Sequence, residues 1–217
     1  MEQNSGIDMS IDQRNKYGDT PLHVAAFEGD WQKVQLLLQD KRNDVNAKNN
    51  YDNTPIHYAV VEEHVEVLKV LLAGSTTINV NAIDKDTYAP LHYTSYTGHL
   101  EMTQALLKDV KINVNVKDKY KNAPLHYAAF EGHVEVLKAL LANKGIDVNI
   151  KNQHDNTPLY YAASKGHLDV VKTLVDATGI QIMIKNKYGN SPLDTANWNN
   201  HPRCLDVLYN AVHKNEV

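Results

Sequence analysis

The sequence predicts a mainly α-helical protein in which short helix pairs stack on one another as a repeat array. The motif Thr-Pro-Leu-His, or a near copy of it, occurs six times, and successive copies are 34, 35, 34, 34 and 34 residues apart. A near-constant period of this length is typical of stacked repeats, because one short unit cannot bury its apolar face alone. The prolines of the motif are Pro21, Pro55, Pro90, Pro124, Pro158 and Pro192.

The fourth repeat shows why each motif opens a helix. Pro124 suits the first helical position, where a missing N–H group costs nothing. Leu125, Ala128 and Ala129 then form a narrow apolar face that a neighbouring helix can approach closely. Gly132 follows where a left-handed backbone is needed to end the helix. In other repeats a hydroxyl that can cap the helix precedes the proline, at Thr20, Thr54, Thr157 and Ser191.

A second helix is predicted from about His133 to Ala142, because apolar residues recur there at helical spacing. Glu135 and Lys138 lie three residues apart on its wetter side, where they can pair weakly. An extended segment, 147–151, then leads into a polar turn before the next proline. The apolar stripe consists of Val134, Val136, Leu137, Leu140 and Leu141.

Composition fits one elongated domain. The 217 residues carry a net charge of −4, which gives no support for nucleic-acid binding. Cys204 is the single cysteine, so an internal disulfide is excluded and a reducing, cytoplasmic location fits. We expect Cys204 to be a half-buried side chain that fills space in the core. The polar segment 1–11 lacks the features of a secretory signal and is expected to be a mobile tail. No apolar run is long enough to span a bilayer.

We therefore expect a monomer with a single domain over residues 12–217. Its six repeats are predicted at about 15–48, 49–82, 84–117, 118–151, 152–185 and 186–217.

From about Asp12 to its C-terminus, the chain resembles the ankyrin repeat proteins. The diagnostic segments are Thr-Pro-Leu-His-Val-Ala-Ala at 20–26 and Ala-Pro-Leu-His-Tyr-Ala-Ala at 123–129, with near copies in the other repeats. A Gly-His step recurs, and Asp-Val-Asn at 44–46 and 147–149 matches the end of the family's repeat. The resemblance implies a solenoid of helix pairs joined by β-hairpin-like fingers. It also implies protein binding through the groove between finger tips and first helices, without a cofactor.

Several positions depart from the family's pattern. Glu63 replaces the helix-ending glycine of the second repeat, and Thr87 and Lys121 replace a finger glycine. The third repeat has Thr94 and Ser95 where two alanines are usual. We therefore expect repeats two and three to be the least regular, and the sixth to act as a polar cap.

Catalysis and metal binding have little support in the sequence. Most of the 11 histidines recur once per repeat, at the positions of His126 and His133, whereas a zinc site needs three or four converging ligands. We interpret them as hydrogen-bonding groups that tie helix ends to neighbouring loops. No phosphate-binding loop, nucleophile elbow or HExxH motif is present.

Registration on the family places the partner-binding residues. In the fingers they are Lys48, Tyr51, Lys85, Tyr88, Lys117, Lys119, Tyr120, Lys151 and His154. In the first helices they are Tyr58, Val61, Glu62, Tyr93, Tyr96, Tyr127, Phe130, Glu131, Tyr161, Lys165 and Trp198.

Two rows within this set admit two interpretations each. Lysines recur at the position of Lys117, either as ordinary solubilising charges or as a basic ridge that steers an acidic partner surface. Tyrosines recur at the position of Tyr127, either to fill gaps between repeats or as binding anchors. The hypothesis is a groove that binds a protein or peptide through aromatic anchors flanked by lysines, as an inhibitor or scaffold.

Two alternative functions remain open from the sequence. Asn46 and Asn149 fit the family's recognition pattern for an asparaginyl hydroxylase, which would make the chain a substrate for modification. The second alternative is a bacterial effector, which would be secreted into a host cell and act on a host protein.

Overall fold

The structure is a computed structural model that describes residues 13–213. The expected mobile tail lies outside these residues. The chain divides into two compact units, of which unit 1 spans residues 1–85 and unit 2 spans residues 86–217. Within residues 13–213 the chain forms twelve α-helices and no strand. The expectation of one domain over 12–217 stays a prediction.

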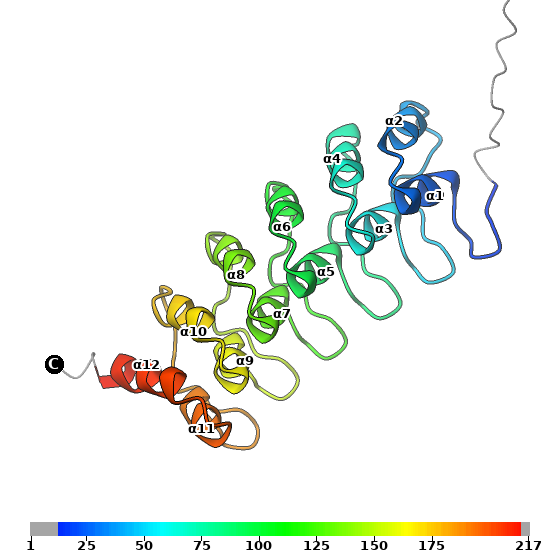
Figure 1. The fold of residues 1–217 in the computed structure, drawn as a ribbon. Coiled ribbons are helices and arrows are strands. Elements are labelled where there is room, and N and C mark those ends of the chain that lie inside the picture. Colours follow the sequence, from blue (N-terminus) through cyan, green and yellow to red (C-terminus); the bar gives the residue numbers. More distant parts are fainter. Residues whose placement is uncertain (1–12, 214–217) are drawn as a thin grey trace, which may run out of the picture. The chain divides into compact units, whose positions relative to one another are not determined.

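Unit 1 consists of two helix pairs. The first helices α1 and α3 pack against each other, and so do the second helices α2 and α4 (Figure 1). The core between them includes Leu22, Ile56, Leu68 and Leu71, each at most 1% exposed. The helices are α1 (Pro21–Glu28), α2 (Trp31–Gln39), α3 (Pro55–Val61) and α4 (Val65–Gly74).

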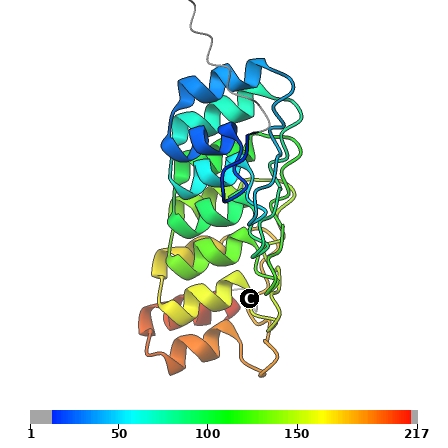
Figure 2. The same cartoon turned by 90° about the vertical axis from the view of Figure 1, so that its right-hand side faces the viewer.

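Unit 2 consists of four helix pairs. Its first helices α5, α7, α9 and α11 pack in one row, and its second helices α6, α8, α10 and α12 pack in a second row (Figure 1). Within each unit the finger loops project to one side of the helices (Figure 2). The helices are α5 (Pro90–Thr97), α6 (Leu100–Leu107), α7 (Pro124–Glu131), α8 (Val134–Leu141), α9 (Pro158–Lys165), α10 (Leu168–Val175), α11 (Pro192–Trp198) and α12 (Pro202–His213).

Every first helix begins at the motif proline, as predicted. The Thr157 hydroxyl accepts a hydrogen bond from the Tyr160 N–H at 3.2 Å, and Ser191 caps α11 in the same way. In the sixth repeat Asp194 replaces the motif histidine. Its carboxylate accepts hydrogen bonds from the Ser191 hydroxyl and N–H, and these bonds, led by that of the hydroxyl, lower the pKa of Asp194.

In both units, motif histidines tie a first helix to the next finger, as the sequence predicts. The Ala123 N–H donates to Nδ1 of His126 at 3.0 Å, so this nitrogen carries no proton. Nε2–H therefore donates to the Asn156 carbonyl, at 3.0 Å. Burial lowers the pKa of His126 to about 4, which keeps the ring neutral. His23 in unit 1 and His92 in unit 2 bond in the same way to Asn53 and Asn122.

A second histidine series explains the glycine that ends four of the first helices, α1, α5, α7 and α9. Gly132 is left-handed, with φ +84°, and a Cβ atom there would lie 2.7 Å from the His167 ring. The Nε2–H group of His167 donates to the Phe130 carbonyl at 2.9 Å. Glu63 occupies the equivalent position in unit 1 with φ 58°, so it keeps the left-handed backbone expected of the missing glycine.

The fingers are hairpin-like turns without assigned strands. In the fourth repeat the Asp118 N–H donates to the Asn122 carbonyl, and the Lys121 N–H returns to Asp118 O. Lys121 is left-handed, with φ 61°, which corresponds to a three-residue hairpin whose last residue favours glycine. One Asp118 carboxylate oxygen accepts the N–H groups of Tyr120 and Asn122, both at 2.8 Å, and so fixes the turn.

The expectation that repeats two and three are the least regular stays a prediction. Helix α5 has eight residues, like α7 and α9. Ser95 is fully buried, and its hydroxyl is a buried side-chain oxygen that lacks a hydrogen-bond partner among the described residues. Cys204 is buried on α12, and burial raises the pKa of its thiol, in agreement with the expected filler role.

Candidate functional site

The predicted partner-binding residues are distributed over both units. Unit 1 carries Lys48, Tyr51, Tyr58, Val61, Glu62 and Lys85. Unit 2 carries Tyr88, Tyr93, Tyr96, Lys117, Lys119, Tyr120, Tyr127, Phe130, Glu131, Lys151, His154, Tyr161, Lys165 and Trp198.

Tyr127, on α7, is bound to the framework of unit 2. Its hydroxyl donates to the second carboxylate oxygen of Asp118 at 2.6 Å, and the Tyr88 hydroxyl lies 3.3 Å away. Burial and the bond to Asp118 raise the pKa of Tyr127. Tyr127 therefore binds Asp118, the residue whose carboxylate fixes the finger turn of the same repeat.

Equivalent tyrosines make the same type of contact. In unit 1 the Tyr58 hydroxyl donates to Asp19 at 3.1 Å and accepts from Asn49, and burial followed by the Asp19 charge raises its pKa to about 12. In unit 2 the Tyr161 hydroxyl accepts from the Asn152 amide at 2.8 Å. We call Tyr58, Tyr127 and Tyr161 the anchored tyrosines. Their hydroxyls favour the gap-filling interpretation of this row.

A second set of aromatic side chains lies three residues further along the first helices of unit 2. Tyr96 is 53% exposed and Trp198 is 65% exposed. Phe130 is half-buried, and the Lys165 ammonium group lies 4.2 Å from the centre of its ring. We call Tyr96, Phe130 and Trp198 the outer aromatics. A partner can reach the rings of Tyr96 and Trp198, and part of the Phe130 ring.

Two members of each set meet around a hollow in unit 2 of about 140 Å³. Tyr96 packs edge-to-face on Tyr127 at 6.1 Å between ring centres, and Phe130 packs edge-to-face on Tyr161 at 5.5 Å. Within each pair the two rings are nearly perpendicular, so they form adjacent walls of the hollow that meet at a steep angle. The hollow is lined by these four rings together with Asn122, His126 and Glu131.

Exposed aromatic side chains also occupy the finger tips. Tyr120 is 44% exposed in unit 2, and Tyr51 is 52% exposed in unit 1. The equivalent Tyr17 and Tyr188 were not among the predicted binding residues, although both are exposed. Each finger-tip tyrosine directly precedes the left-handed residue of its turn. An alignment of the repeats at that position would have identified Tyr17 and Tyr188. Within unit 2 the tips are linked by backbone, since the N–H of residue 153 donates to the Tyr120 carbonyl.

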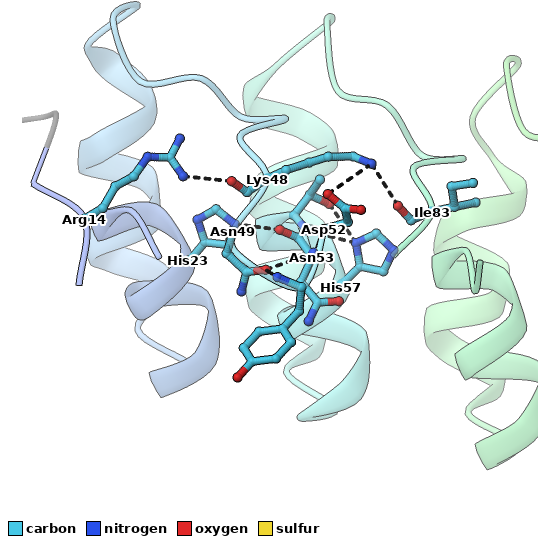
Figure 3. A network of polar contacts seen from close by, with 10 residues as sticks. Arg14, His23, Lys48, Asn49, Asp52, Asn53, His57 and Ile83 are labelled. Atoms are coloured by element: carbon cyan, nitrogen blue, oxygen red, sulfur yellow. Dashed lines mark hydrogen bonds and ion pairs between the residues drawn. The ribbon is translucent and has the colours of Figure 1, made fainter. Parts of the chain in front are cut away.

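The lysine row is partly structural in unit 1. Arg14 donates to the Lys48 carbonyl at 2.7 Å, and the Lys48 ammonium group donates to the Ile83 carbonyl at 3.2 Å (Figure 3). Lys48 also lies 4.0 Å from Asp52. These long side chains therefore connect one finger to the next. This contact within the chain accounts for a basic residue at this position, and no partner protein is needed to explain it.

In unit 2 the row is mixed. Lys117 donates to the Lys151 carbonyl at 3.0 Å. Lys119, two residues beyond the row, forms an ion pair with Asp86 at 2.7 Å that raises the pKa of Lys119. The side chains of Lys151 and Lys185 are exposed. Lys117 is exposed as well and keeps its charge, so all three lysines can contribute to the steering of an acidic partner.

The asparagines proposed for modification bridge repeats. The Asn46 amide donates to the Thr77 carbonyl at 2.9 Å and accepts from the Asn79 N–H at 2.7 Å. Asn149 makes the same two bonds to Gly179 and Gln181. Both side chains are half-buried, so the hydroxylation hypothesis stays a prediction that requires these bonds to open.

The described residues contain no group of three or more His, Cys, Asp or Glu side chains arranged to hold a metal ion. Among the helices of residues 13–213, none has the length and apolar character needed to cross a membrane.

Comparison with known proteins decides the family. A family model described as ankyrin repeats (3 copies) matches residues 4–84 and 74–152, and a second, ankyrin repeats (many copies), matches residues 140–196. The chain belongs to the ankyrin repeat family. A crystal structure of the ankyrin repeat protein EF0377 is 27% identical, covers 87% of this chain and 96% of its own, and superposes with a TM-score of 0.81. The predicted fold class of stacked ankyrin helix pairs is thereby confirmed.

Two curated relatives share a segment with this ankyrin chain. Alpha-latrotoxin-Lh1a from Latrodectus hasselti is 32% identical over 102 residues, which is 47% of this chain and 7% of the toxin. The mouse (Mus musculus) serine/threonine-protein kinase TNNI3K is 33% identical over 95 residues, or 43% of this chain and 11% of the kinase. The chain thus matches only a small part of these relatives' length.

Proposed function

We propose that this protein binds a segment of a partner protein on the side of unit 2 formed by its fingers and first helices. Ankyrin repeats are in general protein-binding modules, and the partner's identity is not specified by the family. The observation that carries the proposal is the 140 Å³ hollow, which is bordered by the exposed ring of Tyr96 and the half-buried ring of Phe130. Large aromatic side chains beside a pocket are typical of binding hot spots.

The framework contacts narrow the set of residues that contribute binding energy. The hydroxyls of the anchored tyrosines and the motif histidines are engaged within the chain. Tyr96, Phe130, Trp198 and Tyr120 remain as anchors. Exposed Lys151 and Lys185 would attract acidic groups of the partner and raise its association rate. In unit 1, Phe27, Tyr51 and Val61 are exposed at equivalent positions.

The test replaces two outer aromatics without disturbing the framework. A partner recovered with the wild-type chain as bait is purified and titrated against the double variant Tyr96→Ala, Phe130→Ala by isothermal calorimetry. Tyr127 is left intact because it holds Asp118. We expect the double variant to bind at least about tenfold more weakly.

The matched control is Tyr209→Ala, which removes an aromatic side chain that is 55% exposed on α12, in the row of second helices. It should bind the partner like the wild type. Circular dichroism and urea denaturation establish that the variants are folded. Equal affinity of the folded double variant and the wild type would contradict the proposal.

A further inference from the structure

The hollow of unit 2 combines aromatic rings with one carboxylate. Tyr96, Tyr127, Phe130 and Tyr161 supply the rings, and Glu131 supplies the charge. Glu131 takes part in no ion pair among the described residues, and its side chain is half-buried at the end of α7. Aromatic faces carry partial negative charge and attract cations, and a nearby carboxylate adds to this attraction.

The chain itself places a cation against this group of rings. The Lys165 ammonium group lies 4.2 Å from the centre of the Phe130 ring, well within the range of a cation–π contact. The residues that line the hollow include neither Lys165 nor any other lysine or arginine. The hollow itself is left open to a group from another molecule.

We propose that the hollow binds an arginine side chain of the partner. This rests on the proposed function and specifies the chemistry that the same surface recognises. A guanidinium group is weakly hydrated, stacks on aromatic rings and donates in a fork that fits a carboxylate, which makes it easier to desolvate than an ammonium group. Glu131 accepts from the guanidinium, and Tyr96 and Phe130 hold its planar group and aliphatic stem.

The finger charges define the surroundings of this arginine in the partner. Lys121, Lys151 and Lys187 are exposed on the fingers of unit 2. A partner segment that lies along these fingers is therefore expected to carry acidic residues beside the arginine. The recognised pattern is a single basic side chain within an acidic stretch.

Short synthetic peptides test this chemistry without the natural partner. The probe is a blocked peptide, acetyl-Asp-Ala-Arg-Ala-Asp-amide, and its matched forms carry citrulline or norleucine in place of the arginine. Citrulline keeps the shape and removes the charge, and norleucine offers an apolar chain. Binding to the full chain is followed by NMR shifts of the tyrosine and phenylalanine rings. The arginine peptide should bind at least about tenfold more tightly than the other two.

Two charge variants locate the site. Glu131→Gln should weaken binding of the arginine peptide about fivefold and leave the citrulline peptide unchanged, whereas the control Glu135→Gln on α8 should change neither. Lys165→Met should strengthen arginine binding about twofold, because the Phe130 ring loses its own cation, and Lys172→Met on α10 should not.

The outcomes separate this inference from the proposed function. Tighter binding of the norleucine peptide, equal binding of the arginine and citrulline peptides, or no binding of the arginine peptide would each overturn it. The proposed function fails independently, if the folded Tyr96→Ala, Phe130→Ala variant binds the captured partner like the wild type.

Discussion

Two aromatic residues on one helix have different roles. Tyr127 and Phe130 are three residues apart on α7, and both border the same hollow. The Tyr127 hydroxyl is bound to Asp118 at 2.6 Å, whereas Phe130 contacts a neighbouring ring and an exposed lysine. One side chain belongs to the framework of the repeat and the other to its accessible surface.

The difference teaches that recurrence along the sequence does not by itself identify binding residues. Tyrosines recur at the Tyr127 position because the finger needs a donor or acceptor there, as the Tyr58 and Tyr161 contacts show. The Phe130 position varies more, with Tyr96, Ser164 and Trp198 in unit 2 and Phe27 and Val61 in unit 1. Variation at an exposed position is what a recognition surface requires, and four predictions test this division.

The largest expected effect concerns the framework and pH. His126 has a lowered pKa in the folded chain, about 4 against 6.5, because burial disfavours its charged form. The unfolded chain therefore takes up a proton between these values and the folded chain does not. The contribution of His126 to the free energy of unfolding is therefore full above about pH 6.5 and falls by roughly 3 kcal/mol as the pH drops to about 4.

Urea denaturation at about pH 7 and about pH 4.5 measures this loss. The variant His126→Gln should be less stable at neutral pH and should lose less stability on acidification. The exposed His213→Gln serves as a control with the wild-type pH dependence. Either of two results would show that His126 is not neutral and buried in the folded protein. One is a wild type that gains stability on acidification, and the other is a His126→Gln variant with the pH dependence of the wild type.

The next effect compares two hydroxyls. Tyr127→Phe removes the donor to Asp118, and we expect a loss of about 2 kcal/mol because the lost bond involves a charged group. Tyr96→Phe removes an exposed hydroxyl and should change stability by less than about 0.5 kcal/mol. Urea denaturation gives both values, and equal losses would abolish the distinction between the two sets of aromatics.

A smaller effect of opposite sign is expected at Ser95. Its buried hydroxyl has no partner among the described residues, so Ser95→Ala should stabilise the protein by about 1 kcal/mol. Ser164→Ala is the control, since the Ser164 hydroxyl accepts a bond from Asn199 at 3.1 Å and its loss should not stabilise. Thermal denaturation compares the two. A destabilised Ser95→Ala protein would indicate that this hydroxyl is paired.

The smallest effect concerns one backbone position in both units. Glu63 has φ 58°, and Glu63→Gly should stabilise by about 0.5 kcal/mol because glycine adopts this conformation without strain. Gly132→Ala should destabilise the protein, since the added Cβ would lie 2.7 Å from His167. Chemical denaturation of both variants measures the effect, and a neutral Gly132→Ala would rule out the close contact.

Much of the fold could be predicted from the sequence because its signals are local and repeated. Pro124 marks a helix start, Gly132 a left-handed end, and the position of His126 a bond between helix and finger. The repeat period supplies the register, so even Glu63 could be assigned a left-handed backbone.

The candidate site was predicted less completely because it depends on contacts between repeats. Whether Tyr127 binds Asp118 or a partner cannot be deduced from its spacing. The hollow requires rings from three first helices, α5, α7 and α9, and no single repeat contains it. Tyr17 and Tyr188 were missed because the predicted finger residues came only from the internal repeats.

The most direct test of the account measures stability and partner affinity on the same two variants, Phe130→Ala and Tyr127→Phe. We predict that Phe130→Ala lowers the affinity for the captured partner about tenfold while the protein stays folded. Tyr127→Phe should lose stability and retain most of that affinity. The reverse result, with Tyr127→Phe abolishing binding and Phe130→Ala binding normally, would contradict the assignment of framework and recognition surface.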